Sequence, residues 1–310
     1  MRDMKIVASV LLLGLAGCTV NPSTGRSQFL LLSVEQAQAL GEESKLEVVQ
    51  QYGGELESAE VTSYVERVGR SMARFTEADY PDLPWEFTVL DSDVVNAFAL
   101  PGGKVFASRG LLVGLDNEAQ LAGVLGHEIG HVTGQHVNER ISQAILISGI
   151  VLGTSVAAGS SDSEWARVVP IVVGAAGTGY LLSFNRDQET EADEQGLKYM
   201  TAAGYDPAAM IELLEVLKGA GDGSRPPEFL STHPYPETRI ETVSRLLAGP
   251  YAYTQDNPAF RKFPDRYRRD ALQHLPAAEP AALAARGWCT VCRSRPGRHE
   301  SDRDRFCGGS

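Results

Sequence analysis

Apolar residues recur at every third or fourth position through much of the chain, which is the spacing of helices with one buried face. This pattern predicts helices over residues 33–51, 61–75, 118–142, 187–202, 207–218 and 236–249. Ser33 and Gln36 have the spacing of a capping box, and Asp206 followed by Pro207 is a typical helix start. Helices are therefore expected to make up most of the fold.

A shorter region has the pattern of a sheet. The stretch WEFTVLDS, residues 85–92, alternates apolar and polar positions as a strand does. The stretch NAFALPGGKVFASRGLL, residues 96–112, places Pro-Gly-Gly between two apolar runs, which predicts strand, turn and strand. The sequence thus predicts an α+β fold that is mainly helical, with a small antiparallel sheet.

Two stretches without charged residues, 141–161 and 168–185, are long enough to cross a membrane as helices. Nearly half of the first stretch is Gly, Ser, Thr or Gln, which weakens that interpretation. We expect an apolar helical hairpin over 141–185 that packs on the protein or at an interface, and membrane insertion is the alternative.

The N-terminus, MRDMKIVASVLLLGLAGC, has a basic start, a short apolar run and small residues before Cys18. This is the layout of a bacterial secretory signal. Its end, LAGC, resembles the lipobox at which a signal peptidase cuts before a cysteine that becomes lipid-modified. We expect residues 1–17 to be a lipoprotein signal peptide and Cys18 to be lipidated, with a plain signal peptide or an anchor helix as the alternative. Thr19 favours the periplasmic side of the outer membrane, by resemblance to other lipoproteins.

Composition limits the remaining possibilities. The net charge of −12, with no dominant basic patch, argues against a nucleic-acid partner. Apart from Cys18, the cysteines all lie near the C-terminal end: Cys289, Cys292 and Cys307. The body of the chain therefore offers neither a thiol nucleophile nor a disulfide framework. A disulfide or a disordered tail is favoured over a second zinc site for these cysteines.

The stretch LGHEIGHVTGQHVNER, residues 125–140, contains the candidate chemistry. His127 and His131 lie four residues apart, within about 40° of each other around a helix, so both can bind one zinc ion. Glu128 follows the first histidine and would lie beside a water at that metal. Gly126 and Gly130 leave room for another helix to approach closely.

His136 is a tempting third ligand for the metal. If the helix continues, however, His136 points about 140° away from His131. We therefore exclude His136 from the metal site and expect it to be a polar surface residue.

A second helix is expected to supply the third ligand. In RDQETEADEQG, residues 186–196, Glu189 and Asp193 share a helical face, whereas Glu191 points away from it. One carboxylate can bind zinc while the other accepts the N–H of a ligand histidine. The pattern E-x-x-x-D after H-E-x-x-H is the gluzincin arrangement, so we expect Glu189 to be the ligand and Asp193 its supporting residue. Glu191 is interpreted as part of a solvated acidic helix start.

The blocks NAFALPGGKVFASRGLL, LGHEIGHVTGQH, RDQETEADEQGLKYM and STHPYPETRIE occur in the order found in the CAAX prenyl protease/HtpX family of zinc metallopeptidases. The chain resembles that family over roughly residues 21–248, and its lipobox resembles the family's periplasmic lipoprotein branch. The resemblance implies a gluzincin domain with one Zn²⁺ per chain, held by His127, His131 and Glu189, and with Glu128 as catalytic base. It also implies an edge strand that pairs with an extended substrate, formed by Asn96, Ala97, Phe98, Ala99 and Leu100.

His233, in STHPYPETRIE, precedes a proline and is therefore expected on a loop before the last predicted helix. The resemblance places this loop beside the zinc. Two functional roles stay open. His233 is either an inhibitory fourth ligand of the zinc or a group that stabilises the oxyanion. The alternative is a loop histidine that caps the helix of Arg239.

The predicted organisation is a signal peptide over 1–17, an N-terminal segment over 18–60, a zinc metallopeptidase domain over 61–249 and a largely disordered extension over 250–310. The predicted function is an endopeptidase that cleaves unfolded or misassembled envelope proteins, is held at the membrane by its lipid and can join envelope assembly complexes. A chaperone-like outer-membrane assembly factor and an integral-membrane protease are the alternatives.

Overall fold

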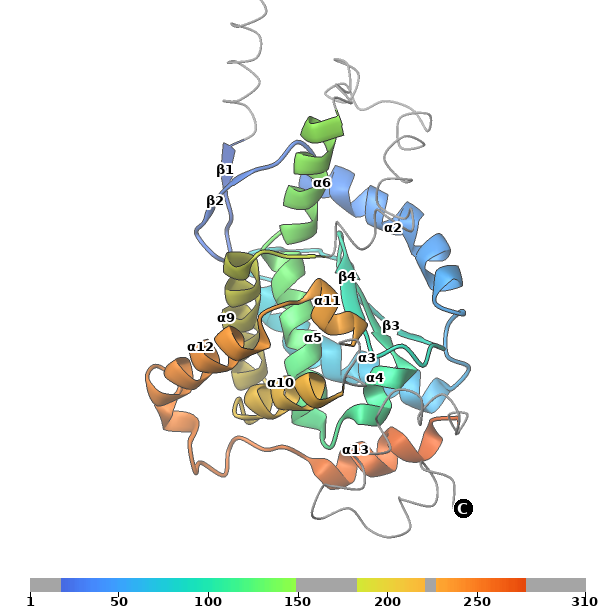
Figure 1. Cartoon of the computed structure of the whole chain (residues 1–310), viewed down its shortest axis with the longest axis vertical. Coiled ribbons are helices and arrows are strands. Elements are labelled where there is room, and N and C mark those ends of the chain that lie inside the picture. The colour runs from blue at the N-terminus through green and yellow to red at the C-terminus, as the bar shows by residue number, and fades with distance from the viewer. Residues whose placement is uncertain (1–17, 149–182, 221–226, 277–310) are drawn as a thin grey trace, which may run out of the picture.

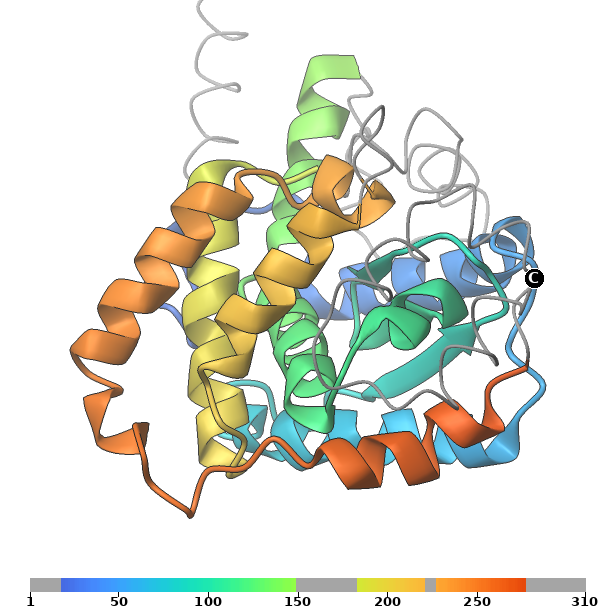
Figure 2. The same ribbon diagram turned by 60° about the horizontal axis from the view of Figure 1, so that its bottom comes forward.

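The computed structural model confirms the α+β, mainly helical fold, and it describes residues 18–148, 183–220 and 227–276. Helix α5 (Glu118–Thr133) lies at the centre, with α9 (Arg186–Ala202) beside it (Figure 1). Helices α3 (Ala59–Ala73) and α10 (Ala209–Gly219) contact other sides of α5, and α12 (Pro236–Ala248) lies against α9 and α10 (Figure 2). Nearly every residue of α5 is buried as a result.

The sheet contains β3 (Glu86–Leu90), β4 (Ala97–Leu100) and β5 (Lys104–Ser108), in the order β3-β5-β4. β4 and β5 form the expected antiparallel pair. After the turn, β5 lies between the other two strands, where it also pairs with β3 in parallel. Gly102 and Gly103 form that turn with φ of 83° and 81°, which glycine adopts without strain. β4 is therefore an edge strand, as predicted.

Successive side chains of β4 point into two different cores, as the two-residue period of a strand requires. Ala97 and Ala99 face the main core, which lies among α3, α5 and α10. Phe98 and Leu100 face a smaller core under α2 (Val34–Gln51) and α6 (His136–Ser148). The sheet thus separates the central helices from the N-terminal helix.

The helix ends follow the predicted capping chemistry in most cases. The capping box of Ser33 and Gln36 is present at the start of α2. Asn117 is the N-cap of α5, and its side chain accepts a hydrogen bond from the Gln120 N–H. α10 begins at Ala209, two residues later than expected, although the Asp206 carboxylate still accepts a hydrogen bond from Ala208 N–H at 3.0 Å.

The prediction of one helix from Glu118 to Ser142 is wrong. The helix ends at Thr133, and α6 begins at His136 after a break formed by Gly134 and Gln135. Gln135 has φ of 54°, in the left-handed region that ends helices. The break turns α6 into a new direction and places His136 back over the end of α5.

A short N-terminal hairpin packs across this break. Its strands are β1 (Cys18–Val20) and β2 (Ser27–Phe29), which pair antiparallel. The Asn21 side-chain amide donates to the carbonyl of Thr133 at 2.8 Å, and the Gln28 amide donates to the carbonyl of Gly134. The hairpin therefore binds the carbonyl groups that α5 leaves unpaired at its C-terminal end.

Residues 250–276 belong to the folded domain, contrary to the expected disorder. Tyr267 of α13 is fully buried and donates a hydrogen bond to the Leu112 carbonyl at 2.6 Å, while Arg266 forms an ion pair with the buried Glu118. The remaining short elements are η1 (Arg74–Thr76), α4 (Arg109–Gly114), α11 (Glu228–Thr232), η3 (Ala252–Thr254), α13 (Pro264–Asp270) and η4 (Leu272–His274).

Some predicted features lie outside the described residues. They are the signal peptide over 1–17, most of the hairpin over 141–185, and the tail with Cys289, Cys292 and Cys307. Within the described ranges, no helix has both the length and the apolar character needed to cross a membrane.

Candidate metal centre

The close contact between α5 and α9 brings the two predicted ligand helices together. A side-chain carbon on Gly130 would lie 2.7 Å from the carbonyl oxygen of Ala192, and one on Gly126 would lie 3.2 Å from that of Gly196. Because these positions have no side chain, the backbones of the two helices can approach each other. The predicted role of Gly126 and Gly130 in close approach is thus confirmed.

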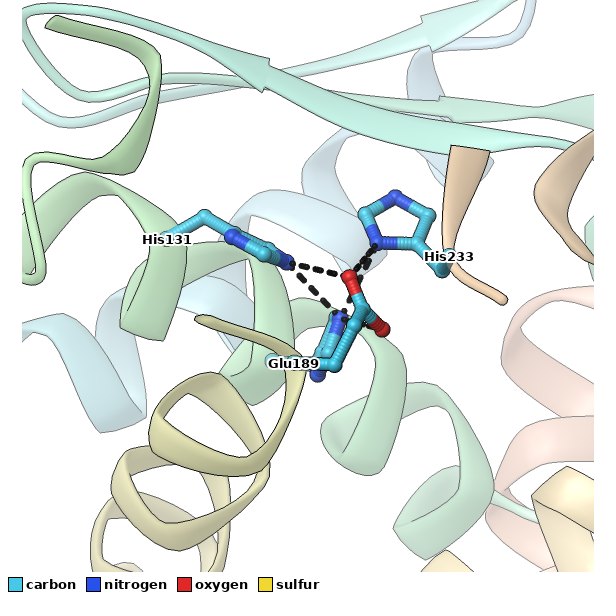
Figure 3. A group of neighbouring side chains, drawn as sticks. His131, Glu189 and His233 are labelled. Atoms are coloured by element: carbon cyan, nitrogen blue, oxygen red, sulfur yellow. Dashed lines mark hydrogen bonds and ion pairs between the residues drawn. The ribbon is translucent and has the colours of Figure 1, made fainter. Parts of the chain in front are cut away.

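Four buried side chains converge at this contact: His127, His131, Glu189 and His233. One ligand atom from each lies within 4.8 Å of the other three. The Nε2 atoms of His127 and His131 are 3.0 Å apart. His233 Nδ1 is 3.0 Å from Glu189 Oε1, and His131 faces the same two side chains (Figure 3). The structure therefore brings together the three predicted zinc ligands and the loop histidine.

These atoms fit a zinc ion. Three imidazole nitrogens and one carboxylate oxygen are donor types that zinc binds in four-coordinate protein sites. His127 Nε2 lies within 3.2 Å of a nitrogen of His131 and of a nitrogen of His233, so three imidazole nitrogens face one common position. Both carboxylate oxygens of Glu128 are buried beside this group and lack a hydrogen-bond partner among the described residues.

Asp193 lies against His127, the ligand histidine that the sequence predicts it to support. Its Oδ1 atom lies 2.9 Å from His127 Nδ1, one helical turn beyond Glu189. With the proton on Nδ1, the Nε2 lone pair of His127 is directed at the ligand group.

Arg239 is a residue of the site that the sequence reasoning missed. It lies on α12 and is only 3% exposed, with Nη1 at 2.9 Å from Glu189 Oε2 and Nη2 at 2.6 Å from Asp193 Oδ1. The guanidinium thus holds the Glu189 and Asp193 side chains of α9 in place. An arginine six positions after His233, in the same sequence block, was the available signal.

The prediction that His136 is a surface residue is wrong, as is the interpretation of Glu191 as solvated. His136 is fully buried, with Nδ1 at 2.8 Å from His131 Nδ1 and Nε2 at 2.7 Å from Glu191 Oε2. The error followed from extending α5 through His136, whereas the break at Gly134 and Gln135 turns the ring back toward His131. Among the described residues, the candidate ligand group does not include His136.

The charge states follow from burial and from the neighbouring charges. Burial raises the pKa of Glu128 to about 7, while burial and the charge of Arg239 lower the pKa of His127 to about 4. Burial alone would raise the pKa of Glu189, but the charges of His233 and Arg239 outweigh it and hold that pKa well below its usual value. A neutral imidazole and an ionised carboxylate are the forms that bind a metal.

His233 lies on the predicted loop. It ends the short helix α11, and Pro234 and Tyr235 separate it from α12. Its Nδ1 faces the ligand group, and its Nε2 lies 3.5 Å from Glu128 Oε1. His233 therefore contacts both the metal-binding atoms and the candidate base.

The predicted substrate strand lies next to the metal-bearing helix. β4 contacts α5, and no further strand pairs with its outer edge within the described residues. The side chains of Ala97 to Leu100 are buried, as is Asn96, whose amide donates a hydrogen bond to Glu228 Oε1 at 2.9 Å. Any contact with a substrate at this strand would involve its backbone.

Comparisons with known proteins agree with this geometry. The model of Peptidase family M48 matches residues 59–247. The "Beta-barrel assembly-enhancing protease" of Escherichia coli K12 is 32% identical over 228 residues, which are 71% of this chain and 45% of that protein. The "Mitochondrial metalloendopeptidase OMA1" of Schizosaccharomyces pombe is 34% identical over 229 residues, or 73% of this chain and 65% of that protein.

The human "Metalloendopeptidase OMA1, mitochondrial" is 29% identical over 243 residues, or 74% of this chain and 45% of that protein. The chain thus spans between 45% and 65% of the length of these three relatives.

Proposed function

The chain belongs to peptidase family M48, and from that premise we propose that it is a zinc-dependent endopeptidase that cleaves unfolded or misassembled proteins of the cell envelope. One observation supports this proposal above the others. Glu128 stands between two buried ligand histidines in sequence, and its two carboxylate oxygens lie beside the ligand atoms without a hydrogen-bond partner among the described residues. A protein that only bound its clients would not need a carboxylate there.

In this proposal His127, His131 and Glu189 hold the zinc. When bound there, zinc supplies a Lewis acid that polarises a carbonyl group and lowers the pKa of a water molecule. Asp193 and Arg239 keep the ligand side chains in orientation, because both are buried and hydrogen-bonded to them or to each other. The chain's own residues thus fix the geometry before any substrate arrives.

Glu128 is the proposed general base. It would take a proton from the attacking water and deliver it to the amine that leaves when the peptide bond breaks. Burial raises the pKa of Glu128 in the metal-free protein, and the charge of a bound zinc ion would act against that shift and favour the ionised form that accepts a proton.

The edge strand β4 is the proposed binding site for the substrate backbone. An extended peptide would add to the sheet beside Ala97–Leu100, with Asn96 at the start of the strand. Main-chain hydrogen bonds of this kind depend little on sequence but require a locally unfolded substrate. This preference suits the removal of misassembled proteins.

His233 is proposed to restrain the enzyme as a fourth ligand. Its Nδ1 lies 3.2 Å from His127 Nε2 and 3.0 Å from Glu189 Oε1, so this nitrogen is directed at the metal position. A group that stabilised the oxyanion would instead face the substrate carbonyl. A substrate would have to displace His233, which limits cleavage to chains that bind well.

The location of the enzyme is also a proposal. Cys18 is exposed at the start of β1, where a lipid would be accessible to a membrane. The sequence LAGC, which ends at Cys18, has the form of a lipobox. The name of the Escherichia coli relative connects that protein with β-barrel assembly. We propose a protein anchored by its lipid to the periplasmic side of the outer membrane, able to join envelope assembly complexes.

A digestion assay tests the activity. The full chain with zinc should cleave casein or a denatured outer-membrane porin, and a chelator should stop the cleavage. Glu128→Gln should keep zinc but lose about 10²–10⁴-fold of the rate, since general acid–base catalysis contributes that much. Cleavage that persists in chelator, or loss of zinc from Glu128→Gln, would contradict the assigned roles.

A further inference from the structure

We propose that His136 is a positioning residue for zinc ligand His131, and that Glu191 and Arg26 orient His136 in turn. These four residues form a hydrogen-bonded chain, called here the His136 chain, which connects the metal site with the N-terminal hairpin. The inference rests on the proposed function only in taking this site to bind zinc.

The contacts of the His136 chain are short and mostly buried. His131 Nδ1 lies 2.8 Å from His136 Nδ1, and His136 Nε2 lies 2.7 Å from Glu191 Oε2. Arg26 Nε donates to the same Glu191 oxygen at 2.9 Å. His131 and His136 are 1% and 0% exposed, so water does not replace these partners.

The donors and acceptors of the chain agree with one tautomer of His131. Because its Nε2 faces the ligand group, that nitrogen must offer a lone pair, and the proton must be on Nδ1. Nδ1–H then donates to His136 Nδ1, which leaves the proton of His136 on Nε2, where it donates to the Glu191 carboxylate. Each hydrogen bond of the His136 chain therefore joins one donor to one acceptor, and no two donors face each other.

The far end of the chain is held by the N-terminal hairpin. Arg26 lies between β1 and β2, and its Nη1 and Nη2 donate to the two carboxylate oxygens of Glu139 on α6 at 3.1 and 2.9 Å. One guanidinium therefore joins α6, which carries His136, to α9, which carries Glu191. The residues just after the proposed lipidation site thus become part of the metal site's support.

Gly134 provides the space that the His136 chain needs. A side-chain carbon on Gly134 would lie 2.5 Å from His136 Nε2, so the ring can turn back only over a glycine. The ring of His131 also stacks on Phe184 with a centroid distance of 3.8 Å. This stacking fixes the plane of the His131 ring, and the bond to His136 fixes its rotation within that plane.

The two histidine ligands on α5 thus have different supports. His127 donates directly to a carboxylate, Asp193, whereas His131 reaches its carboxylate, Glu191, through a second imidazole. Partners of this kind orient a ligand and raise its basicity, and their loss costs about 10–100-fold in metal affinity. We expect a loss of that size when His136 can no longer accept the proton of His131.

The test measures zinc affinity in the full chain by competition with a chromophoric chelator. His136→Phe keeps a ring but removes the acceptor, so its zinc dissociation constant should rise about 10–100-fold. His136→Gln offers an acceptor and a donor and should keep most of the affinity. Tyr205→Phe is the control. It removes a buried hydrogen bond to Glu118, which lies on α5 as His131 does, and it leaves the His136 chain intact.

Cobalt substitution adds a measurement that stability alone does not change. The visible spectrum of bound Co²⁺ reports the geometry of its ligands, and it should change in His136→Phe but stay as in the wild type in Tyr205→Phe. If His136→Phe does not fold, as judged by circular dichroism, Glu191→Ala decides the matter and should also weaken zinc binding, because it removes the acceptor for His136 Nε2.

Several results would overturn the inference. An unchanged zinc affinity and cobalt spectrum in His136→Phe, or an unchanged affinity in Glu191→Ala where that variant decides, would do so. An equal loss of affinity in Tyr205→Phe would attribute the effect to general stability. A wild-type chain that bound no zinc would overturn the proposed function as well, so the two failures can be told apart.

Discussion

Replacing Gly130 with alanine should separate the two helices that hold the metal. The added carbon would lie 2.7 Å from the Ala192 carbonyl oxygen, against the 3.4 Å at which ordinary contact begins, so about 0.7 Å of movement is required. The obstacle is backbone, which cannot rotate away as a side chain can. α9 must therefore shift relative to α5.

The energetic effect on folding is smaller than the effect on the metal. Alanine in a helix is favoured over glycine by about 0.5–1 kcal/mol, while overpacking costs about 1–3 kcal/mol, so the net loss of stability should be at most about 2.5 kcal/mol. Zinc sites, however, tolerate only about 0.2 Å of deviation in ligand distance. Because Glu189 lies on α9 and His127 and His131 lie on α5, a shift of about 0.7 Å should greatly weaken zinc binding.

The chain offers a matched control on the same helix. A carbon on Gly123 would meet the Leu213 side chain at 3.3 Å and the Met210 sulfur at 3.6 Å, both of which can move. Gly123→Ala should therefore keep wild-type zinc affinity and gain slightly in stability. Chelator competition would measure the affinities, and thermal unfolding with and without chelator would measure the stability contributed by zinc. If Gly130→Ala held zinc as tightly as Gly123→Ala, the proposed link between helix contact and metal geometry would be refuted.

Four further substitutions test the remaining assignments. Glu189→Ala should weaken zinc binding more than Glu191→Ala, because Glu191 acts only behind a ligand, where about 10–100-fold is expected; equal zinc contents after dialysis would reverse the assignment. His233→Ala should raise basal casein cleavage with zinc retained, whereas a lower rate would favour the oxyanion role and an unchanged rate and affinity would remove His233 from the site. Cys18→Ala should abolish lipid labelling and leave a larger precursor on a gel, and a protein of mature size would disprove the lipobox.

The parts of the structure that the sequence predicted are those decided within one element. The positions of His127 and His131 on α5, and of Glu189 and Asp193 on α9, follow from the helical period alone. The capping box of α2 likewise depends only on residues three apart.

The parts that it missed depend on where separate elements meet. His136 is buried because a single left-handed residue, Gln135, redirects the chain, and the sequence pattern continues through that break without a change of period. Arg239 is buried because carboxylates from α9 surround it, which no local pattern of α12 reveals. The folded segment 250–276 is held by a few anchors, such as Tyr267, and lacks a continuous apolar stripe.

The charges of the centre explain why these contacts occur together. Glu128, Glu189 and Asp193 are each fully buried, and Arg239 is their buried cationic neighbour. Three ionised carboxylates and one guanidinium leave a net charge of about −2, which is costly to bury unless it is compensated. In the metal-free protein His233 supplies part of that compensation, because the charges of Glu189 and Glu128 outweigh its burial and raise its pKa. A divalent ion among the ligand atoms would balance that charge. In the metal-free protein the raised pKa of Glu128 favours its protonated form, which removes part of the negative charge. Arg239 alone would leave the centre unbalanced, so the guanidinium and the metal are complementary parts of one buried charge network.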